Sequence, residues 1–302
     1  MTASPWLWAV FTLIAAAAQT VRNATQHELT GKLGTVGATH VRFLFGLPFA
    51  CLFLLGVIVV GGAALPHPGL VFWPWVLAGA LLQIAATALM LAAMGERSFV
   101  VAIAYIKTEP IQVALFGLVF LGDHVTPLMA AAILIATSGV VVMSLKSGAK
   151  SGIFGGDVVP TVLGLSAGAC FALSAIGYRG AILSLHDPNF VMAATFTVTI
   201  GLAVQTALLT GWLMLRDRTV LAAIFRAWRP SLFAGFMGAL ASQFWFLGFA
   251  TATAASVRTL ALVEVLFAQA ISHFVFKQPV SAREGIGIVL IVAGVALLVW
   301  AY

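Results

Sequence analysis

Two acidic residues lie near the centres of long apolar stretches, and they are the strongest chemical signal in the sequence. Glu109 lies within the stretch 98–120, and Glu264 lies within the stretch 254–276. An ionised carboxylate at the centre of a bilayer costs about 2.5–3.5 kcal/mol on insertion scales, so such residues often mark substrate or ion pathways. Either acid can carry a proton, bind a cation or pair with a buried base that holds two helices together.

Three side chains close to Glu109 can act with it. Lys107 lies about 200° from Glu109 around a helix, so the two do not share a face. Lys107 is expected to bind an anionic group of a substrate, to pair with Glu264 or to snorkel toward the membrane surface. Tyr105, one turn before the acid, is expected to line the same wall or to pack with its hydroxyl satisfied. Pro110 removes a backbone hydrogen bond and is expected to kink the helix, which would free a carbonyl for substrate or water.

Glu264 has a base earlier in its own stretch. Arg258 precedes it by about one and a half helical turns. The matching position in the first half of the chain is Ile103, so we expect the two gates of a transport path to be lined differently. The alternative role for Arg258 is snorkelling at the end of its helix.

Amide side chains occupy the centres of two other apolar stretches. Gln83 and Gln243 can each hydrogen-bond a polar substrate or join neighbouring helices. Trp245 can stack against an organic ligand or pack as an apolar side chain. Arg42 lies near the start of its stretch, where we expect snorkelling or contact with lipid headgroups. Arg179 lies near the end of its stretch, and both arginines are candidates for coupling or gating.

The composition places all these residues in a membrane. Of the 302 residues, 62% are hydrophobic and 8% are charged, whereas about a quarter of the residues of soluble proteins are charged. The net charge of +6 comes from bases scattered between apolar stretches, which indicates membrane lipids as partners and no nucleic acid. No phosphate-binding loop, zinc-protease motif or paired-cysteine motif occurs, so we expect no enzyme activity, no cofactor and no metal.

Ten stretches are long enough to cross a bilayer, which requires about 20 apolar residues in a helix. These stretches are 5–21, 36–60, 71–94, 98–120, 126–145, 159–183, 190–214, 230–250, 254–276 and 282–301. The predicted fold is therefore an all-α integral membrane protein with ten transmembrane helices. A polar linker at 147–158 separates residues 1–146 from residues 159–302, with five helices on each side.

The two halves show signs of an internal repeat. Shifting the second half back by 155 positions pairs Glu264 with Glu109 and Gly294 with Gly139. An odd number of helices in each half would insert the halves in opposite orientations. Such inverted five-helix repeats are typical of secondary transporters, whose substrate site lies near the midplane.

The bases between the stretches predict the orientation in the membrane. Nearly all of them lie in odd-numbered loops, the first of which is expected to hold Arg22 and Lys32. Because basic loops remain on the cytoplasmic side, we expect the odd-numbered loops in the cytoplasm and both termini outside. The expected location is the inner membrane of the cell.

Several short motifs resemble those of the drug/metabolite transporter superfamily, EamA type. The first half contains Gly95-Glu-Arg-Ser98, Glu109-Pro110, Leu121-Gly-Asp123 and the segment Ala136 to Val140. The second half keeps Glu264, Gln278-Pro279 and Ala293-Gly-Val295, but it has Val265 in the place of Pro110. The resemblance implies alternating access and the export or exchange of small metabolites. Many members keep their termini in the cytoplasm, which differs from the orientation that the loop charges predict.

The residues and the resemblance together predict a secondary-active or facilitative transporter, as a monomer or homodimer. If the bases within the stretches line one cavity with the two acids, the net charge there is +2; these bases are Arg42, Lys107, Arg179 and Arg258. That balance favours export of an anionic or zwitterionic compound such as an amino acid, coupled to protons through Glu109 and Glu264. The alternatives are a lipid or lipid-headgroup flippase, a cationic-drug exporter and a membrane enzyme.

Overall fold

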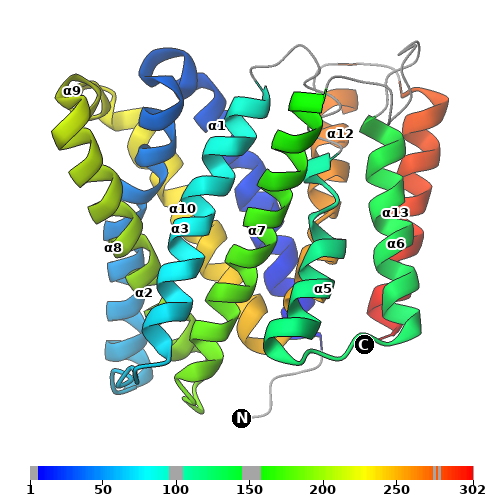
Figure 1. Cartoon of the computed structure of the whole chain (residues 1–302), viewed down its shortest axis with the longest axis horizontal. Coiled ribbons are helices and arrows are strands. Elements are labelled where there is room, and N and C mark those ends of the chain that lie inside the picture. The colour runs from blue at the N-terminus through cyan, green and yellow to red at the C-terminus, as the bar shows by residue number, and fades with distance from the viewer. Residues whose placement is uncertain (1–5, 95–104, 145–157, 275–276, 278–279, 302) are drawn as a thin grey trace. The chain divides into compact units, whose positions relative to one another are not determined.

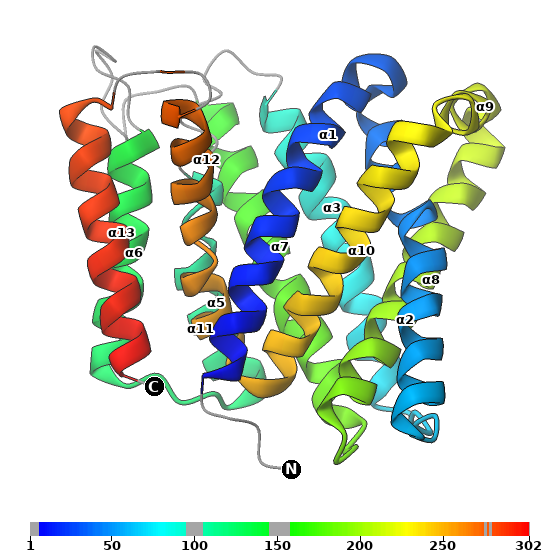
Figure 2. The same ribbon diagram turned by 180° about the vertical axis from the view of Figure 1, so that it is seen from behind.

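The computed structural model describes residues 6–94, 105–144, 158–274, 277 and 280–301. Every regular element in this part of the chain is a helix (Figures 1 and 2). Six helical segments among the described residues are long and apolar enough to cross a membrane: Leu29–Gly61, Phe72–Met90, Val162–Ser184, Phe190–Arg216, Trp228–Thr251 and Ala282–Trp300. An all-helical membrane protein that crosses the bilayer several times is therefore confirmed. The count of ten spans and the inversion of the halves remain predictions.

The chain divides into two compact units, and each unit takes helices from both halves of the sequence. The first unit comprises residues 1–84 and 177–252, and the second comprises residues 85–176 and 253–302. Three predicted features lie outside the described residues; they are the linker up to residue 157, the motif Gly95–Ser98 and the turn Gln278–Pro279.

Four long helices pack against one another in the first unit. They are α1 (Leu7–Leu44), α2 (Gly46–Gly61), α8 (Phe190–Arg216) and α10 (Trp228–Thr251), and the unit also holds the first part of α3 (Phe72–Met94) and the end of α7 (Val158–Ser184). Small residues allow close approach between membrane helices. A Cβ atom on Gly177 of α7 would lie 2.8 Å from the backbone nitrogen of Gly79 in α3. These two helices therefore meet backbone to backbone at a pair of glycines.

Helix α1 continues through the region expected to be the first loop. It is helical from Leu7 to Leu44 with one break at Gly34, where φ is 68° and ψ is 177°. A positive φ of this size favours glycine, because other residues meet a steric clash there. Arg22 consequently lies inside a helix and is only 6% exposed. Its assignment to a loop is therefore wrong.

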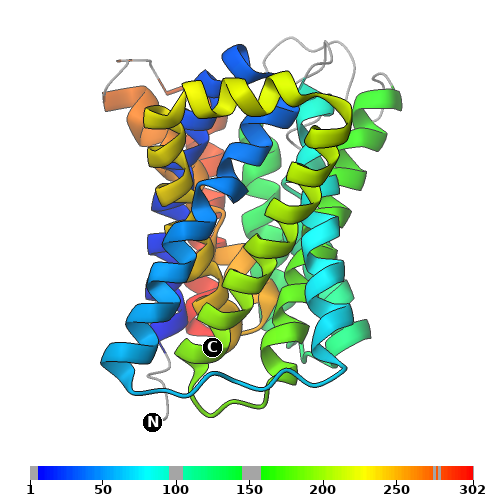
Figure 3. The same cartoon turned by 90° about the vertical axis from the view of Figure 1, so that its left-hand side faces the viewer.

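A short helix that the sequence analysis did not predict, α9 (Arg218–Arg226), connects α8 and α10. Figure 3 shows it in yellow, lying across the ends of these two helices. Its Ile224 is fully buried in one apolar cluster with Leu29 and Leu33 of α1. This burial gives the middle of α1 an apolar partner, which explains why α1 remains helical there.

Among its described residues, the second unit contains five named helices besides the remaining parts of α3 and α7. They are α5 (Glu109–Leu121), α6 (Pro127–Ser144), α11 (Ala254–Leu260), α12 (Val263–Phe274) and α13 (Ala282–Trp300). Helices α6 and α13 lie side by side (Figures 1 and 2). A Cβ atom on Gly139 would lie 2.7 Å from the carbonyl oxygen of Gly287, and one on Gly294 would lie 2.5 Å from the backbone nitrogen of Ala136. The two glycines matched by the 155-residue shift thus serve the same helix contact.

Candidate functional site

The predicted span 98–120 is not one continuous helix. Residues 105–106 are helical, residues 107–108 form a turn, and α5 begins at Glu109. Pro110 therefore lies in the first turn of α5, where the missing N–H has no helical partner to lose. The expected kink inside a helix at Pro110 is wrong, because a new helix starts there instead.

Hydrogen bonds stabilise the turn at residues 107–108, and α7 packs against it. The N–H and the hydroxyl of Thr108 both donate to the carbonyl of Tyr105, at 3.1 and 2.6 Å. Gln112 donates to the Thr108 hydroxyl at 3.2 Å. Gly168 of α7 comes so close that a Cβ atom there would lie 3.3 Å from the carbonyl oxygen of Ile106. The Tyr105 side chain is buried at 9% exposure, which agrees with the packed role rather than an open wall.

The predicted span 254–276 is interrupted as well. A turn at residues 261–262 separates α11 from α12. The N–H of Glu264 donates to the carbonyl of Ala261 at 3.0 Å, and helical bonding resumes from there. No proline or glycine lies at this turn. In both interrupted segments a new helix thus begins within one residue of the acid.

The helix ends stabilise the charged groups near them. Glu109 lies in the first turn of α5, Glu264 lies in the first turn of α12, and Arg258 lies in the last turn of α11. A helix carries partial positive charge at its N-terminus and partial negative charge at its C-terminus, worth about 0.3–1 kcal/mol for a complementary side chain. The interruptions therefore create favourable positions for two carboxylates and one guanidinium.

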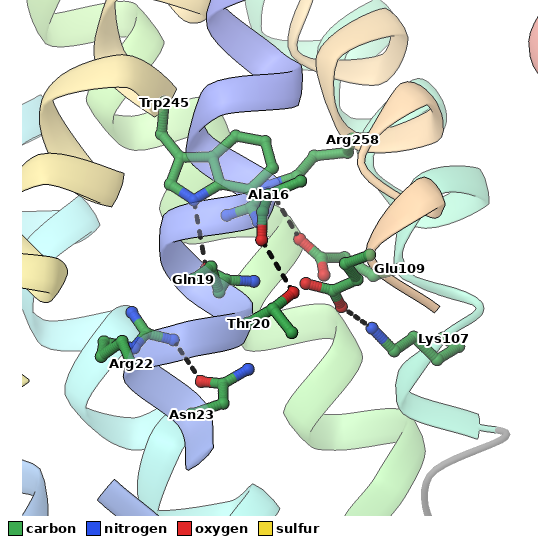
Figure 4. Close-up of polar contacts among 10 residues, drawn as sticks. Ala16, Gln19, Thr20, Arg22, Asn23, Lys107, Glu109, Trp245 and Arg258 are labelled. Carbon is green, nitrogen blue, oxygen red and sulfur yellow. Dashed lines mark hydrogen bonds and ion pairs between the residues drawn. The ribbon is translucent and has the colours of Figure 1, made fainter. Parts of the chain in front are cut away.

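Two ion pairs connect the interrupted segments reciprocally (Figure 4). Lys107 Nζ contacts Glu264 Oε1, and Arg258 Nε lies 3.1 Å from Glu109 Oε1. Each acid therefore pairs with the base of the other segment. All four side chains are largely buried, with exposed fractions from 13% to 24%. Lys107 was expected to bind a substrate anion, to pair with Glu264 or to snorkel; in the structure it pairs with Glu264.

These pairs determine what the site can do chemically. Removing one partner of a buried ion pair leaves an uncompensated charge, which costs about 3–5 kcal/mol. A charged ligand that replaces the lost partner avoids that cost. The arrangement can therefore exchange an internal ion pair for a pair with a ligand. Within the described residues, no group of three or more His, Cys, Asp or Glu side chains could hold a metal ion.

The candidate glutamines of the first unit join helices to one another. Gln83 of α3 accepts a hydrogen bond from Gln205 of α8 at 2.8 Å and one from the Tyr178 hydroxyl of α7 at 3.4 Å. Gln243 of α10 donates to the hydroxyl of Thr195 in α8 at 2.7 Å. These contacts agree with the helix-joining role, which was one of the two roles expected.

Trp245, a further candidate of the first unit, is buried in α10 near Gln243. The indole N–H of Trp245 donates to the side-chain oxygen of Gln19 in α1 at 3.1 Å (Figure 4), and the ring is 4% exposed. The side-chain oxygen of Gln243 is buried and accepts no hydrogen bond from any described residue. Trp245 is therefore a packed side chain with its N–H satisfied, whereas Gln243 retains an acceptor.

Arg42, expected near lipid headgroups, and Arg179, expected to contribute to gating, both belong to the first unit. Arg179 donates to the backbone carbonyls of Phe249 and Ala252, the first at 2.8 Å, and so caps the C-terminus of α10. Arg42 is 8% exposed, and a Cβ atom on Gly238 would lie 3.2 Å from its Cγ atom. Burial of this kind does not fit snorkelling to headgroups. Of the four bases counted in the sequence, Lys107 and Arg258 share the second unit with both acids.

The second half of the chain matches a known protein family. Residues 160–300 match the model of the EamA-like transporter family. The second half of this chain is an EamA-like domain. The family belongs to the drug/metabolite transporter superfamily, so the resemblance seen in the short motifs is confirmed. It points to a membrane transporter rather than an enzyme.

One solved crystal structure resembles nearly the whole chain in fold. It covers 97% of this chain and 94% of its own, with a TM-score of 0.68 and 17% sequence identity. At that identity the likeness concerns the fold alone. No curated protein matches the sequence.

Several polar partners of the candidate residues were not identified from the sequence. Gln205, Tyr178 and Thr195 form hydrogen bonds with the candidate glutamines. All are polar residues inside apolar stretches, which is the signal that could have identified them. Which of them would meet is a property of helix packing, so it could not be read from one sequence.

Proposed function

We propose that this protein is a secondary-active or facilitative transporter that exports a small zwitterionic metabolite, such as an amino acid, by alternating access. The observation that carries the proposal is the pair of reciprocal ion pairs at two interrupted helices. Interrupted helices are typical of substrate and ion sites in secondary transporters, because their ends present charged groups and backbone dipoles at the membrane midplane. The matching glycines and acids of the two halves support the inverted repeat on which alternating access would rest.

The charge balance of the ion pairs favours a zwitterion. Lys107 and Arg258 together neutralise Glu109 and Glu264, so the net charge of the four groups is zero. The carboxylate of an amino acid can replace one glutamate against its base. Its ammonium group can then pair with the released glutamate. No buried charge is left without a partner in this exchange.

Ligands of one charge fit the same four groups less well. A simple anion would release a glutamate without neutralising it, and a simple cation would release a base in the same way. The net charge of +2 that the sequence suggested does not apply to these four groups. Arg179 and Arg42 belong to the first unit, where Arg179 bonds a backbone carbonyl and Arg42 is buried. Of the anionic and zwitterionic substrates expected from the sequence, a zwitterion therefore fits the four groups better.

Proton coupling follows from the same arrangement. An isolated buried carboxylate is usually neutralised by taking up a proton, because an unpaired charge is too costly in an apolar interior. A glutamate that loses its base during the transport cycle would therefore bind a proton until the base returns. Glu109 and Glu264 are the proposed proton carriers.

A lipid or lipid-headgroup flippase, the second candidate, has less support. It requires arginines that open toward headgroups, whereas Arg42 is buried, Arg179 bonds backbone carbonyls and Arg258 pairs with Glu109. No contact among the described residues favours this reading.

The test is counterflow and uptake in proteoliposomes. The substrates are neutral amino acids, phosphorylated metabolites and organic cations, each with and without a pH gradient. Wild type is expected to transport the amino acids, with a pH-dependent component that Glu109→Gln removes and Glu109→Asp retains. Flux of phosphorylated anions or organic cations alone would refute the substrate class. An unchanged pH dependence in Glu109→Gln would assign that residue a structural role.

A further inference from the structure

The connection between α8 and α10 carries a concentrated positive charge. Between residues 216 and 229 the chain has four arginines and one aspartate, a net charge of +3, and all four arginines are exposed. The carboxylate of Asp217 accepts a hydrogen bond from the N–H of Thr219 as the N-cap of α9. The hydrogen bond from the Thr219 hydroxyl lowers the pKa of Asp217, so this acid stays ionised while it is engaged as a cap. The arginines consequently face solvent with little local compensation.

Helix α9 has an apolar face that packs against the protein and an opposite face that carries arginines. Val220 and Leu221 are half-buried and Ile224 is fully buried, all packed against a cluster from α1, α8 and α10. Arg218 and Arg226 lie eight positions apart, which places them about 80° from each other on the side away from that cluster. The helix is therefore anchored to the protein by one face and presents arginines on the other.

Exposed aromatic side chains accompany the arginines. Phe225 is 59% exposed and Trp228 is 50% exposed, and the guanidinium of Arg229 lies 5.4 Å from the centroid of the Trp228 ring. The helices that α9 connects are both long and apolar enough to cross a membrane, and α9 lies across their ends (Figure 3). Arginine on the polar face and aromatic residues beside it are typical of helices that lie in the membrane interface.

We propose that α9 is an interfacial helix whose exposed arginines bind the phosphate groups of anionic phospholipids. Phe225 and Trp228 would lie among the headgroups beside it. The occupant is a lipid surface because the connection is held at the ends of two spans, where headgroups are the nearest source of negative charge. Each arginine near an anionic surface is expected to raise the affinity about fivefold. Binding should weaken as ionic strength rises, because exposed charges are screened.

The experiment titrates the purified full-length protein in a neutral detergent with phosphatidylglycerol or with phosphatidylcholine of the same chain length. Native mass spectrometry counts the bound lipids. Wild type is expected to prefer phosphatidylglycerol. The double variant R218Q/R226Q should bind it about 25-fold more weakly while phosphatidylcholine binding is unchanged. The charge-preserving R218K/R226K should retain most of the preference, and the exposed control K277Q should match wild type.

Two results would overturn the proposal. One is a preference for phosphatidylglycerol that survives unchanged in R218Q/R226Q. The other is displacement of phosphatidylglycerol by inorganic phosphate at equal concentration, which would indicate a site for small anions instead of a lipid surface. If the double variant unfolds, the single variant R226Q replaces it, with an expected fivefold loss. The outcome does not depend on which substrate the protein transports.

Discussion

The two units of the molecule use polar side chains in different ways. In the first unit the candidate residues contact neutral partners: Gln83 bonds Gln205, Gln243 bonds Thr195, and Arg179 bonds backbone carbonyls. In the second unit the candidates are two acids and two bases that pair with each other across interrupted helices. The candidate residues of both units are thus polar groups inside an apolar protein, but only those of the second unit form pairs of opposite charge.

The energies of these contacts differ accordingly. Hydrogen bonds between membrane helices contribute about 0.6 kcal/mol on average, so each can be lost at small cost. Breaking a buried ion pair costs about 3–5 kcal/mol unless another charge replaces the lost partner. Neutral contacts are therefore adequate for a static frame. Ion pairs respond strongly to a charged ligand, which is what a transport site requires.

The largest effect is expected from removing one base of the second unit. R258Q leaves the Glu109 carboxylate without its partner and should lower the free energy of unfolding by up to about 3–5 kcal/mol. It should also abolish transport, as counterflow in proteoliposomes would detect. The reversed pair R258E/E109R should recover part of the stability. If R258Q were as stable and as active as wild type, the claim that the ion pairs of the second unit matter more than the neutral contacts of the first would be wrong.

A smaller effect is expected from Arg179 in the first unit. R179Q loses hydrogen bonds from a charged group to the end of α10, which should cost about 1.5–3 kcal/mol. Because these bonds are structural, the order of preferred substrates should not change. Chemical denaturation in detergent measures the first effect and competition in the uptake assay measures the second. A change in the order of preferred substrates would indicate that Arg179 takes part in substrate binding.

A still smaller effect is expected from Gln83. Replacing it in Q83L removes the acceptor of two hydrogen bonds, while Gln205 keeps its bond to the carbonyl of Ala80 at 3.3 Å. The expected loss is about 0.6 kcal/mol, and at most about 1.7 kcal/mol. Transport should remain within a few-fold of wild type. Complete loss of flux with an unchanged unfolding midpoint would show that the first unit contacts substrate through this residue.

An effect about as small as that of Gln83 is expected from Pro110. The turn at residues 261–262 exists without proline, so P110A should keep the start of α5 at Glu109. Its effect on stability should be about 0.4–1 kcal/mol, mainly through the unfolded chain. Hydrogen exchange of the amides at residues 107–112 would reveal whether the interruption persists. Strong new protection there would mean that proline alone creates the first interruption.

The sequence predicts the membrane class and the two acids well, because a carboxylate inside an apolar stretch is visible without any structure. Pairing of Lys107 with Glu264 was one of several roles that the residues allowed, and only packing decides among them. The interruption before Glu264 was not predictable, since neither proline nor glycine lies there. Helix α9 was missed because nine residues are too few for a span, and Arg22 was misplaced because a polar residue inside an apolar helix resembles a boundary.

The central claim is that opposite charges in the second unit exchange partners with a zwitterion, and a charge swap tests it most directly. The measurement is amino-acid counterflow for the single variants K107E and E264K and for the double variant K107E/E264K. Each single variant should be inactive because it places like charges together. The double variant restores an ion pair in reverse and should regain substantial counterflow. Equal activity of both single variants and wild type would contradict the claim.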